Sequence, residues 1–290
     1  MPLFLPASAC LAADPKLGPC LHLKTAHGTA VVALHGATVV SYVPTGAKDL
    51  LWLSPDAAAA PGKAIRGGIP LCGPWFGPHA LVPNAPMHGL LRIQAWNLLR
   101  VEETAASVRA DFTLALPAEP ARGWAHTAEA LCTVTLGTAL EVELSLRNTG
   151  TTPFLVSGAL HTYLTVGNVH QAAVRGVADR EYIDYTHGRV RRRAAAGDLV
   201  LTEESARFFL TSAPVSLLDP VLKRTIAVES NGHGATVVWN PWDKTAATMA
   251  DVGTRWPEFV CIEAANIPET AVPLAPSLTH HLATRLRLAQ

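Results

Sequence analysis

Residues 131–146 read LCTVTLGTALEVELSL, and this stretch decides the fold class of the chain. Its second half, residues 140–146, alternates apolar side chains with Glu141, Glu143 and Ser145. A period of two is typical of a β-strand that is buried on one face only. The tripeptide GTA between the two halves predicts a hairpin turn. The stretch therefore predicts two antiparallel strands with one face turned toward a core.

Strand patterns recur over most of the remaining chain. Residues 29–43 are rich in valine and are interrupted by Gly36, which predicts two strands joined by a tight turn or a bulge. Further strands are expected at residues 107–116, 154–158, 224–229, 235–240, 258–264 and 279–288. Long amphipathic helix patterns are missing, and 22 prolines and 21 glycines are spread along the chain as turn residues. We therefore expect an all-β fold, a large antiparallel β-sandwich formed by residues 1–290 as a single domain.

The composition predicts a substantial core and no strong overall charge. Hydrophobic residues make up 49% of the chain and charged residues 16%, below the roughly 25% of average soluble domains. Lysine and arginine together number 23, as do aspartate and glutamate. A balanced chain has no long-range field that attracts nucleic acid or an anionic membrane surface, so we expect neither partner. Recognition of an anionic ligand would depend on a few locally placed arginines.

Cysteine usage and the N-terminus indicate the compartment. The five cysteines are odd in number and widely spaced, with no CxxC pair, so neither a disulfide framework nor a zinc site is predicted. Free cysteines fit a reducing compartment. Residues 1–16 lack a basic segment and are interrupted by Pro2 and Pro6, which argues against a signal peptide. No apolar run approaches the roughly 20 residues of a membrane span, and we expect a cytoplasmic protein.

The common cofactor and metal motifs do not occur. The chain has no GxGxxG after a strand, no Walker GxxxxGK[ST], no HExxH and no GxSxG. Its 12 histidines form no HxH or HxxxH cluster with an acidic neighbour at metal-ligand spacing. We expect neither a metal nor a cofactor.

Two glycine-rich and proline-rich stretches carry cationic side chains among aromatic residues. They are residues 64–77, AIRGGIPLCGPWFG, and residues 86–96, PMHGLLRIQAW. The glycine pair after Arg66 would let the backbone approach a ligand closely. Arg92 lies four residues after His88, and a guanidinium can donate two parallel hydrogen bonds to a phosphate. Taken one at a time, Arg66 also fits a surface ion pair and His88 a hydrogen-bonded core residue.

Two later strands each carry a titratable residue suited to proton transfer. His161 lies in SGALHTYLTV, residues 157–166, on the face of Tyr163. Its side chain has an unperturbed pKa of about 6.5, which suits proton donation near neutrality. Glu263 interrupts the apolar strand at residues 258–264, where a carboxylate must either be paired or have a raised pKa. A structural histidine and a buried ion-paired glutamate are the competing interpretations.

Taken together, these segments resemble the hexose-6-phosphate mutarotase branch of the aldose 1-epimerase family. The resemblance covers residues 64–267 and rests on the order of its motifs. These are RGGIP at 66–70, PWFG at 74–77, HG at 88–89 with Arg92, LHTY at 160–163, WNPW at 239–242, MAD at 249–251 and CIEA at 261–264. It implies a galactose-mutarotase-like β-sandwich and a cofactor-free isomerase of the glucose-6-phosphate 1-epimerase type, which interconverts the anomers of a hexose 6-phosphate.

The resemblance also implies roles for the five side chains. His161 matches the family's acid and Glu263 its base. Arg66, His88 and Arg92 match positions that line the sugar site, and the two arginines would hold phosphate. Proton transfer to the ring oxygen requires His161 to be protonated while Glu263 is ionised. Because a nearby carboxylate favours the charged imidazole, we expect the pKa of His161 to be raised.

Two departures from the family pattern concern the substrate. Met87 stands where this branch often has glutamine, and Ala206 stands where an aspartate is expected before arginine. Trp75 and Trp239 are candidates for stacking on the apolar face of the sugar. Two alternatives remain open, an epimerase of a free aldose and a non-catalytic carbohydrate-binding sandwich. We expect a monomer whose ligand is a small sugar phosphate.

Overall fold

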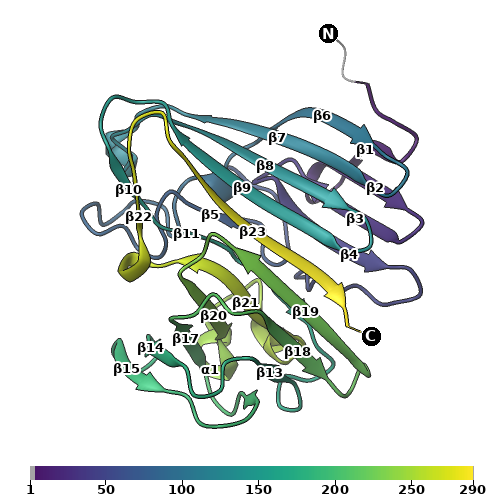
Figure 1. Cartoon of the computed structure of the whole chain (residues 1–290), viewed down its shortest axis with the longest axis vertical. Coiled ribbons are helices and arrows are strands. Elements are labelled where there is room, and N and C mark those ends of the chain that lie inside the picture. The colour runs from purple at the N-terminus through teal and green to yellow at the C-terminus, as the bar shows by residue number, and fades with distance from the viewer. Residues whose placement is uncertain (1–3, 290) are drawn as a thin grey trace.

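The computed structural model of the chain describes residues 4–289 and is built almost entirely from antiparallel strands (Figure 1). Its largest layer is a nine-stranded sheet. In spatial order this sheet contains β16 (Leu199–Val200), β13 (Ala173–Arg175), β18 (Val215–Asp219), β19 (Arg224–Asn231), β23 (Thr279–Leu288), β9 (Leu140–Asn148), β8 (Ala128–Leu136), β7 (Val108–Leu116) and β6 (Asn97–Glu103).

The other strands form three smaller sheets. An eight-stranded sheet contains β15 (Val190–Arg193), β14 (Glu181–Asp184), β17 (Ser205–Phe209), β20 (Ala235–Asn240), β21 (Phe259–Asn266), β11 (Gly158–Leu160) and β5 (Leu71–Cys72), with β12 (Tyr163–Thr165) also paired to β21. A four-stranded sheet contains β1 (Ala9–Asp14), β2 (Gly18–Thr25), β3 (Gly28–Ala33) and β4 (Thr38–Pro44). A two-stranded sheet pairs β10 (Phe154–Val156) with β22 (Val272–Leu274).

Helices are short in the part of the chain that the structure describes. They are α1 (Trp242–Ala247) and the 3-10 turns η1 (Leu91–Ile93), η2 (Pro120–Arg122), η3 (Gly253–Glu258) and η4 (Pro268–Thr270). No helix within residues 4–289 is long and apolar enough to cross a membrane. The all-β prediction is therefore confirmed.

The hairpin predicted from residues 131–146 is confirmed. Strands β8 and β9 pair from Leu136↔Leu140 outward, on either side of the GTA turn. Val142 and Leu144 are buried toward the core, while Glu141 and Glu143 face away from it. Because the side-chain period of a strand is two, this alternation also determines which face of the nine-stranded sheet is apolar.

The apolar face of the nine-stranded sheet is covered by two of the other sheets. One cluster of buried apolar side chains contains Phe112 of β7 and Val134 of β8, Leu23 of the four-stranded sheet, and Val260 and Ile262 of the eight-stranded sheet. Figure 1 shows the four-stranded sheet beside β6–β9 and the strands β17, β20 and β21 beside β19 and β23. The core therefore lies between layers, as expected for a sandwich.

Two predicted strand segments are interrupted where they contact distant parts of the chain. Residues 29–43 form β3 and β4 with a turn at Gly36, whose φ is 71°. A Cβ atom on Gly36 would lie 2.8 Å from the backbone carbonyl oxygen of Arg92, so only glycine allows this approach. Residues 154–158, predicted as one strand, are divided between β10 and β11 in different sheets. Ser157 lies at the break, where its N–H donates to the carbonyl of Pro74 (3.0 Å) and its hydroxyl accepts a hydrogen bond from the Phe76 N–H (3.0 Å).

Candidate active site

A cavity of about 410 Å³ lies over one face of the eight-stranded sheet. Strands β17, β20 and β21 form its floor, and the loops near residues 66, 76–78 and 87–92 form its sides. The side chains predicted from the sequence all line this cavity: Arg66, His88, Arg92, His161 and Glu263. The tertiary fold thus brings residues of four distant segments to one place.

A gap between two short strands places His161 next to Glu263. Strands β11 and β12 both pair with β21, and His161 lies between them. There its N–H donates to the carbonyl of Pro70 (3.0 Å) and not to β21. Nε2 of His161 lies 3.5 Å from Oε1 of Glu263. The imidazole stacks on the Tyr163 ring at a centroid distance of 4.8 Å and an angle of 9°, so these two side chains share a face as predicted.

Glu263 is buried and forms no ion pair with an arginine or lysine among residues 4–289. The residue is 2% exposed, and its Oε2 atom has no hydrogen-bond partner in the same range. Burial raises the pKa of Glu263 well above its usual value, and the positive charge of Arg92 offsets only part of that rise. Of the two interpretations of this glutamate, the geometry therefore favours a raised pKa over a structural ion pair.

The expectation for the pKa of His161 was wrong. Burial lowers the pKa of His161 well below its usual value, and the nearby His88, Arg92 and Arg66 lower it further. The carboxyl group of Glu263 does not reverse this, because burial also disfavours its charged form. Nδ1 of His161 is buried and has no hydrogen-bond partner within the described residues. Both pKa shifts act in the same direction, toward a neutral His161 and a protonated Glu263.

His88 is held as a neutral hydrogen-bond donor. Its backbone lies in the left-handed region (φ 62°), which is uncommon for residues other than glycine and occurs often at functional sites. The Gly77 N–H donates to Nδ1 of His88 (3.2 Å), so the neutral ring carries its proton on Nε2. Burial lowers the pKa of His88 to about 3, with smaller contributions from Arg92 and Arg66. His88 can therefore donate to a ligand but is not protonated near neutrality.

The two arginines differ in how their charge is compensated. Nε of Arg66 donates to Oδ2 of Asp251 (3.0 Å), and its Nη1 donates to the Tyr163 hydroxyl (3.0 Å). Arg92 donates from Nη2 to the carbonyl oxygen of Met87 (2.9 Å), and its buried Nε has no partner. Arg92 also has no ion pair within residues 4–289. It therefore carries the uncompensated positive charge of the cavity.

Two expectations about the loop at residues 64–77 were wrong. A Cβ on Gly67 would lie 2.4 Å from the Trp52 carbonyl oxygen, and one on Gly68 would lie 2.1 Å from that of Val39. These glycines therefore allow close packing of backbone segments, not contact with a ligand. Trp75 is not part of the cavity wall, and its indole N–H donates to the carbonyl of Pro86 (3.0 Å). Phe76 lines the cavity instead, together with the predicted Trp239.

The cavity is also lined by residues that were not predicted from the sequence to belong to the site. Some of them are the positions that depart from the family pattern. Met87 and Ala206 both line it, so the two departures from the family pattern concern the site directly. Tyr185 and Phe208 complete the wall beside Ala206, and their rings stack at 4.0 Å. Both lie on or next to short strands whose few residues show no clear period in the sequence.

Comparisons with known proteins agree with this geometry. The sequence model of a family described as aldose 1-epimerase matches residues 19–287. The chain belongs to the aldose 1-epimerase family. An Escherichia coli relative, provisionally named a glucose-6-phosphate 1-epimerase, is 33% identical over 260 residues, which cover 89% of this chain and 86% of the relative. A relative from Cenchrus ciliaris with the same provisional name is also 33% identical, covering 85% of this chain and 77% of the relative.

Two solved structures confirm the fold of this epimerase. A crystal structure from Salmonella typhimurium, provisionally named a mutarotase, superposes with a TM-score of 0.90 at 28% identity, covering 99% of this chain and 96% of that one. A galactose mutarotase-like protein from Lactobacillus casei superposes with a TM-score of 0.75 at 14% identity, covering 93% and 100%. The predicted galactose-mutarotase-like sandwich is therefore correct, and the family match and its relatives confirm the isomerase class.

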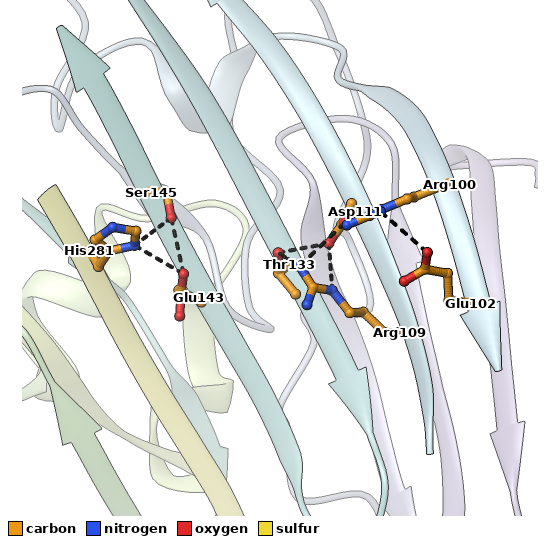
Figure 2. Close-up of polar contacts among 8 residues, drawn as sticks. All are labelled: Arg100, Glu102, Arg109, Asp111, Thr133, Glu143, Ser145 and His281. Carbon is orange, nitrogen blue, oxygen red and sulfur yellow. Dashed lines mark hydrogen bonds and ion pairs between the residues drawn. The ribbon is translucent and has the colours of Figure 1, made fainter. Parts of the chain in front are cut away.

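A second concentration of titratable residues lies on the face of the nine-stranded sheet that is turned away from the core. We call it the outer polar cluster, and Figure 2 shows its members: Arg100, Glu102, Arg109, Asp111, Thr133, Glu143, Ser145 and His281. The Ser145 hydroxyl and the Glu143 carboxylate both contact the same ring nitrogen of His281, Nδ1 (2.8 and 3.1 Å). A serine–histidine–acid relay needs both ring nitrogens, so this trio of the epimerase is not a nucleophilic site.

Proposed function

We propose that this epimerase interconverts the α and β anomers of a hexose 6-phosphate, as a glucose-6-phosphate 1-epimerase. One observation carries the proposal: the cavity that holds the buried Glu263–His161 pair also holds Arg92, a cation without an acidic partner within residues 4–289. On a chain with no net charge, such a guanidinium provides a local site for a phosphate. The provisional names of the curated relatives point to the same substrate.

The mechanism requires two proton transfers, one at each of the two oxygens bonded to C1 of the hemiacetal. Glu263 takes the proton of the C1 hydroxyl while His161 gives one to the ring oxygen, the C1–O5 bond breaks and a C1 carbonyl forms. Rotation about C1–C2 turns the carbonyl to its other face. Ring closure then reverses both transfers, since protonated Glu263 returns a proton to the carbonyl oxygen and His161 accepts the proton of the C5 hydroxyl. The pair holds one proton throughout, and its location alternates.

The lowered pKa of His161 gives the phosphate a second role in this scheme. Arg66 and Arg92 contribute to that lowering. A phosphate dianion bound at Arg92 compensates this positive charge and raises the pKa of His161, toward the protonated state that ring opening requires. It raises the pKa of Glu263 as well, because Arg92 also acts on that carboxyl group. His88, with its proton on Nε2, supplies a neutral donor to the sugar.

We also propose a compartment and an oligomeric state for the enzyme. All five cysteines are free, which supports a reducing compartment and hence the cytoplasm. We propose that the enzyme works as a monomer, with its complete catalytic pair supplied by one chain.

Anomeric exchange measured by NMR tests the proposal. Glucose 6-phosphate, glucose and galactose are compared at several enzyme concentrations, with uncatalysed mutarotation subtracted. We expect acceleration for the phosphate ester and a kcat/KM for it that falls with ionic strength, because exposed charge–charge attraction is screened by salt. Equal or greater acceleration of a free sugar would identify an aldose 1-epimerase instead. Sugar binding without any acceleration would show a carbohydrate-binding protein and contradict the proposal.

A further inference from the structure

The imidazole of His161 lacks the hydrogen bond that usually orients a catalytic histidine. In most such sites, the ring nitrogen that does not face the reacting group donates to a carboxylate or a carbonyl, which fixes the tautomer and the ring plane. Nδ1 of His161 is buried without a partner among residues 4–289. The contact of Nε2 with Oε1 of Glu263, at 3.5 Å, is longer than an ordinary hydrogen bond. Another interaction must therefore hold this ring in its plane.

Three aromatic rings surround the imidazole of His161. The Tyr163 ring lies nearly parallel to it, with a centroid distance of 4.8 Å and an angle of 9°. The rings of His88 and Trp239 meet it almost at right angles, at 5.9 and 5.7 Å. Rotation of an imidazole about its Cβ–Cγ bond has only broad minima of its own, so the packing around the ring decides its orientation. The stacked tyrosine is the neighbour that defines the plane.

Tyr163 is fixed from several sides and is not among the side chains that line the cavity. The residue is 1% exposed, and its backbone pairs with Cys261 of β21. Its hydroxyl accepts a hydrogen bond from Nη1 of Arg66 (3.0 Å). Its ring also packs on Trp52 and Phe259, at centroid distances of 5.8 and 5.2 Å. Tyr163 can therefore influence a bound sugar only through the side chains that it contacts.

We propose that Tyr163 is a positioning residue of the epimerase, whose ring holds the plane of His161 so that Nε2 stays directed toward Glu263. This inference rests on the proposed function, which gives His161 its task in proton transfer. Proton transfer requires donor and acceptor at hydrogen-bond distance, and a displacement of about 1 Å can lower turnover by about 100-fold. The flat ring produces this effect, while the hydroxyl only anchors the tyrosine to Arg66.

Two variants of Tyr163 separate the ring from the hydroxyl. Tyr163→Phe and Tyr163→Leu both lose the hydrogen bond from Arg66, but only the leucine variant loses the flat ring. Anomeric exchange NMR with glucose 6-phosphate should show that kcat falls by about 10- to 100-fold in Tyr163→Leu and stays close to that of the parent in Tyr163→Phe. The two variants should share the same KM, because Tyr163 does not line the cavity.

Tyr182→Leu is the matched control for the loss of a buried tyrosine ring. Tyr182 belongs to β14 of the same sheet, packs on Phe209 at a centroid distance of 5.1 Å and does not line the cavity. This variant should keep the kcat of the parent. If Tyr163→Leu does not fold, Tyr163→Met replaces it, because the longer and more flexible methionine fills more of the space without supplying a flat ring.

The orientation of the imidazole also has a readout that does not depend on turnover. Stacking on an aromatic ring shields the ring protons of His161, so the signal of its Cε1 proton should lie upfield of the usual histidine range in the parent and in Tyr163→Phe. In Tyr163→Leu the signal should move downfield. Its absence from the spectrum of His161→Asn identifies it.

Equal kcat values in the phenylalanine and leucine variants would overturn the inference, as would an unmoved His161 signal in folded Tyr163→Leu. A higher KM with unchanged kcat in the leucine variant would also contradict it, since Tyr163 would then act on binding. If the parent enzyme does not accelerate anomeric exchange of glucose 6-phosphate, the proposed function fails. The His161 signal then still decides whether Tyr163 positions the ring.

Discussion

Asp111 in the outer polar cluster and Glu263 in the cavity are both buried carboxyl groups on antiparallel strands, yet their pKa values move in opposite directions. Burial alone would raise the pKa of Asp111, but hydrogen bonds from Arg100 (2.7 Å), Arg109 (3.0 Å) and Thr133 (2.8 Å) outweigh it and lower the pKa. Glu263 has no such donors, and its pKa rises. A buried carboxylate with all its partners stabilises the fold, whereas one without them is available to a substrate.

The histidines of the two regions differ in the same way. His281 lies on the sheet surface with Nδ1 already bonded to Ser145 and Glu143 (Figure 2). His161 is 6% exposed, its Nδ1 has no partner in the described part of the chain, and its Nε2 faces Glu263 at 3.5 Å. Unsatisfied polar atoms in a buried site cost stability, which is acceptable only where a ligand later satisfies them.

The largest difference between the regions should appear in turnover. Glu263→Gln keeps the shape of the side chain and removes the base, so kcat should fall by roughly 10²- to 10⁴-fold. Asp111→Asn makes the equivalent change in the outer polar cluster and should leave kcat unchanged in the protein that remains folded. Anomeric exchange NMR with glucose 6-phosphate measures both. Turnover of Glu263→Gln close to that of the parent would remove Glu263 from the mechanism.

The next largest difference between the two regions should appear in substrate binding, when an arginine of each region is replaced by alanine. Arg92→Ala should weaken binding of hexose 6-phosphate by about 1.5–3 kcal/mol, roughly 10- to 150-fold in KM, because a charged hydrogen bond to the phosphate is lost. Arg100→Ala is the matched control in the outer polar cluster and should not change KM. Arg66→Ala should affect phosphorylated and free sugars alike, since it also breaks the contacts to Asp251 and Tyr163. Equal losses on both substrates in Arg92→Ala would contradict phosphate binding by Arg92.

Replacing Asp111 should lower the stability of the protein more than replacing Glu263, which is the reverse of the order expected for turnover. Asp111→Asn should lower the free energy of unfolding at pH 7 by about 1–3 kcal/mol, because charge-assisted hydrogen bonds are lost. Urea titration monitored by tryptophan fluorescence measures this. The contribution of Asp111, whose folded pKa is lowered, is present above its unfolded pKa and lost as the pH falls through its folded pKa.

Glu263→Gln should not destabilise the protein at pH 7. Because the folded pKa of Glu263 is raised, the parent loses stability as the pH rises from the ordinary value of 4.5 toward the folded value, and glutamine does not. The variant should therefore gain stability relative to the parent over this interval. A variant that is less stable than the parent by as much as Asp111→Asn would show that Glu263 is a structural residue.

The pH profile should show the smallest effect and tests the coupled pair. A pair that works with one proton follows a bell, whose limbs belong to the pair as a whole. Since the pKa of His161 is lowered, entry of the second proton forms the acid limb; since that of Glu263 is raised, loss of the only proton forms the alkaline limb. The alkaline limb should disappear in Glu263→Gln and the acid limb in His161→Asn. Unperturbed pKa values predict the opposite assignment, so the two variants distinguish them directly.

Local patterns in the sequence predicted most of the sandwich. The strands at residues 131–146 and 279–288 are long and alternate regularly, so they show their period without any tertiary information. The strands β14 and β17, of four and five residues, are too short for this. Strand β17 and Tyr185, which directly follows β14, form part of the cavity wall. Where residues 154–158 divide between two sheets, Ser157 bonds to the distant residues Pro74 and Phe76, which no local pattern reveals.

The candidate site was predicted at the level of residues, from motif order, but its electrostatics were not. Glu263 stood out because a carboxylate in an apolar strand is costly. The pKa of His161 was misjudged because only the carboxylate was considered, whereas burial and two arginines also act on it. The glycine pair after Arg66 was misjudged because the sequence does not show which backbone the glycines approach.

The sequence by itself determined the all-β class, the faces of the long strands and the family, because these depend on side-chain period and on residue order along the chain. Only the tertiary structure decided which charges are compensated. Asp251 reaches Arg66 and leaves Arg92 without an acidic partner among residues 4–289, although the sequence treats the two arginines alike. Protonation at the Glu263–His161 pair is decided in the same way. Desolvation and Coulomb energies depend on distances and burial between segments that lie far apart in the chain.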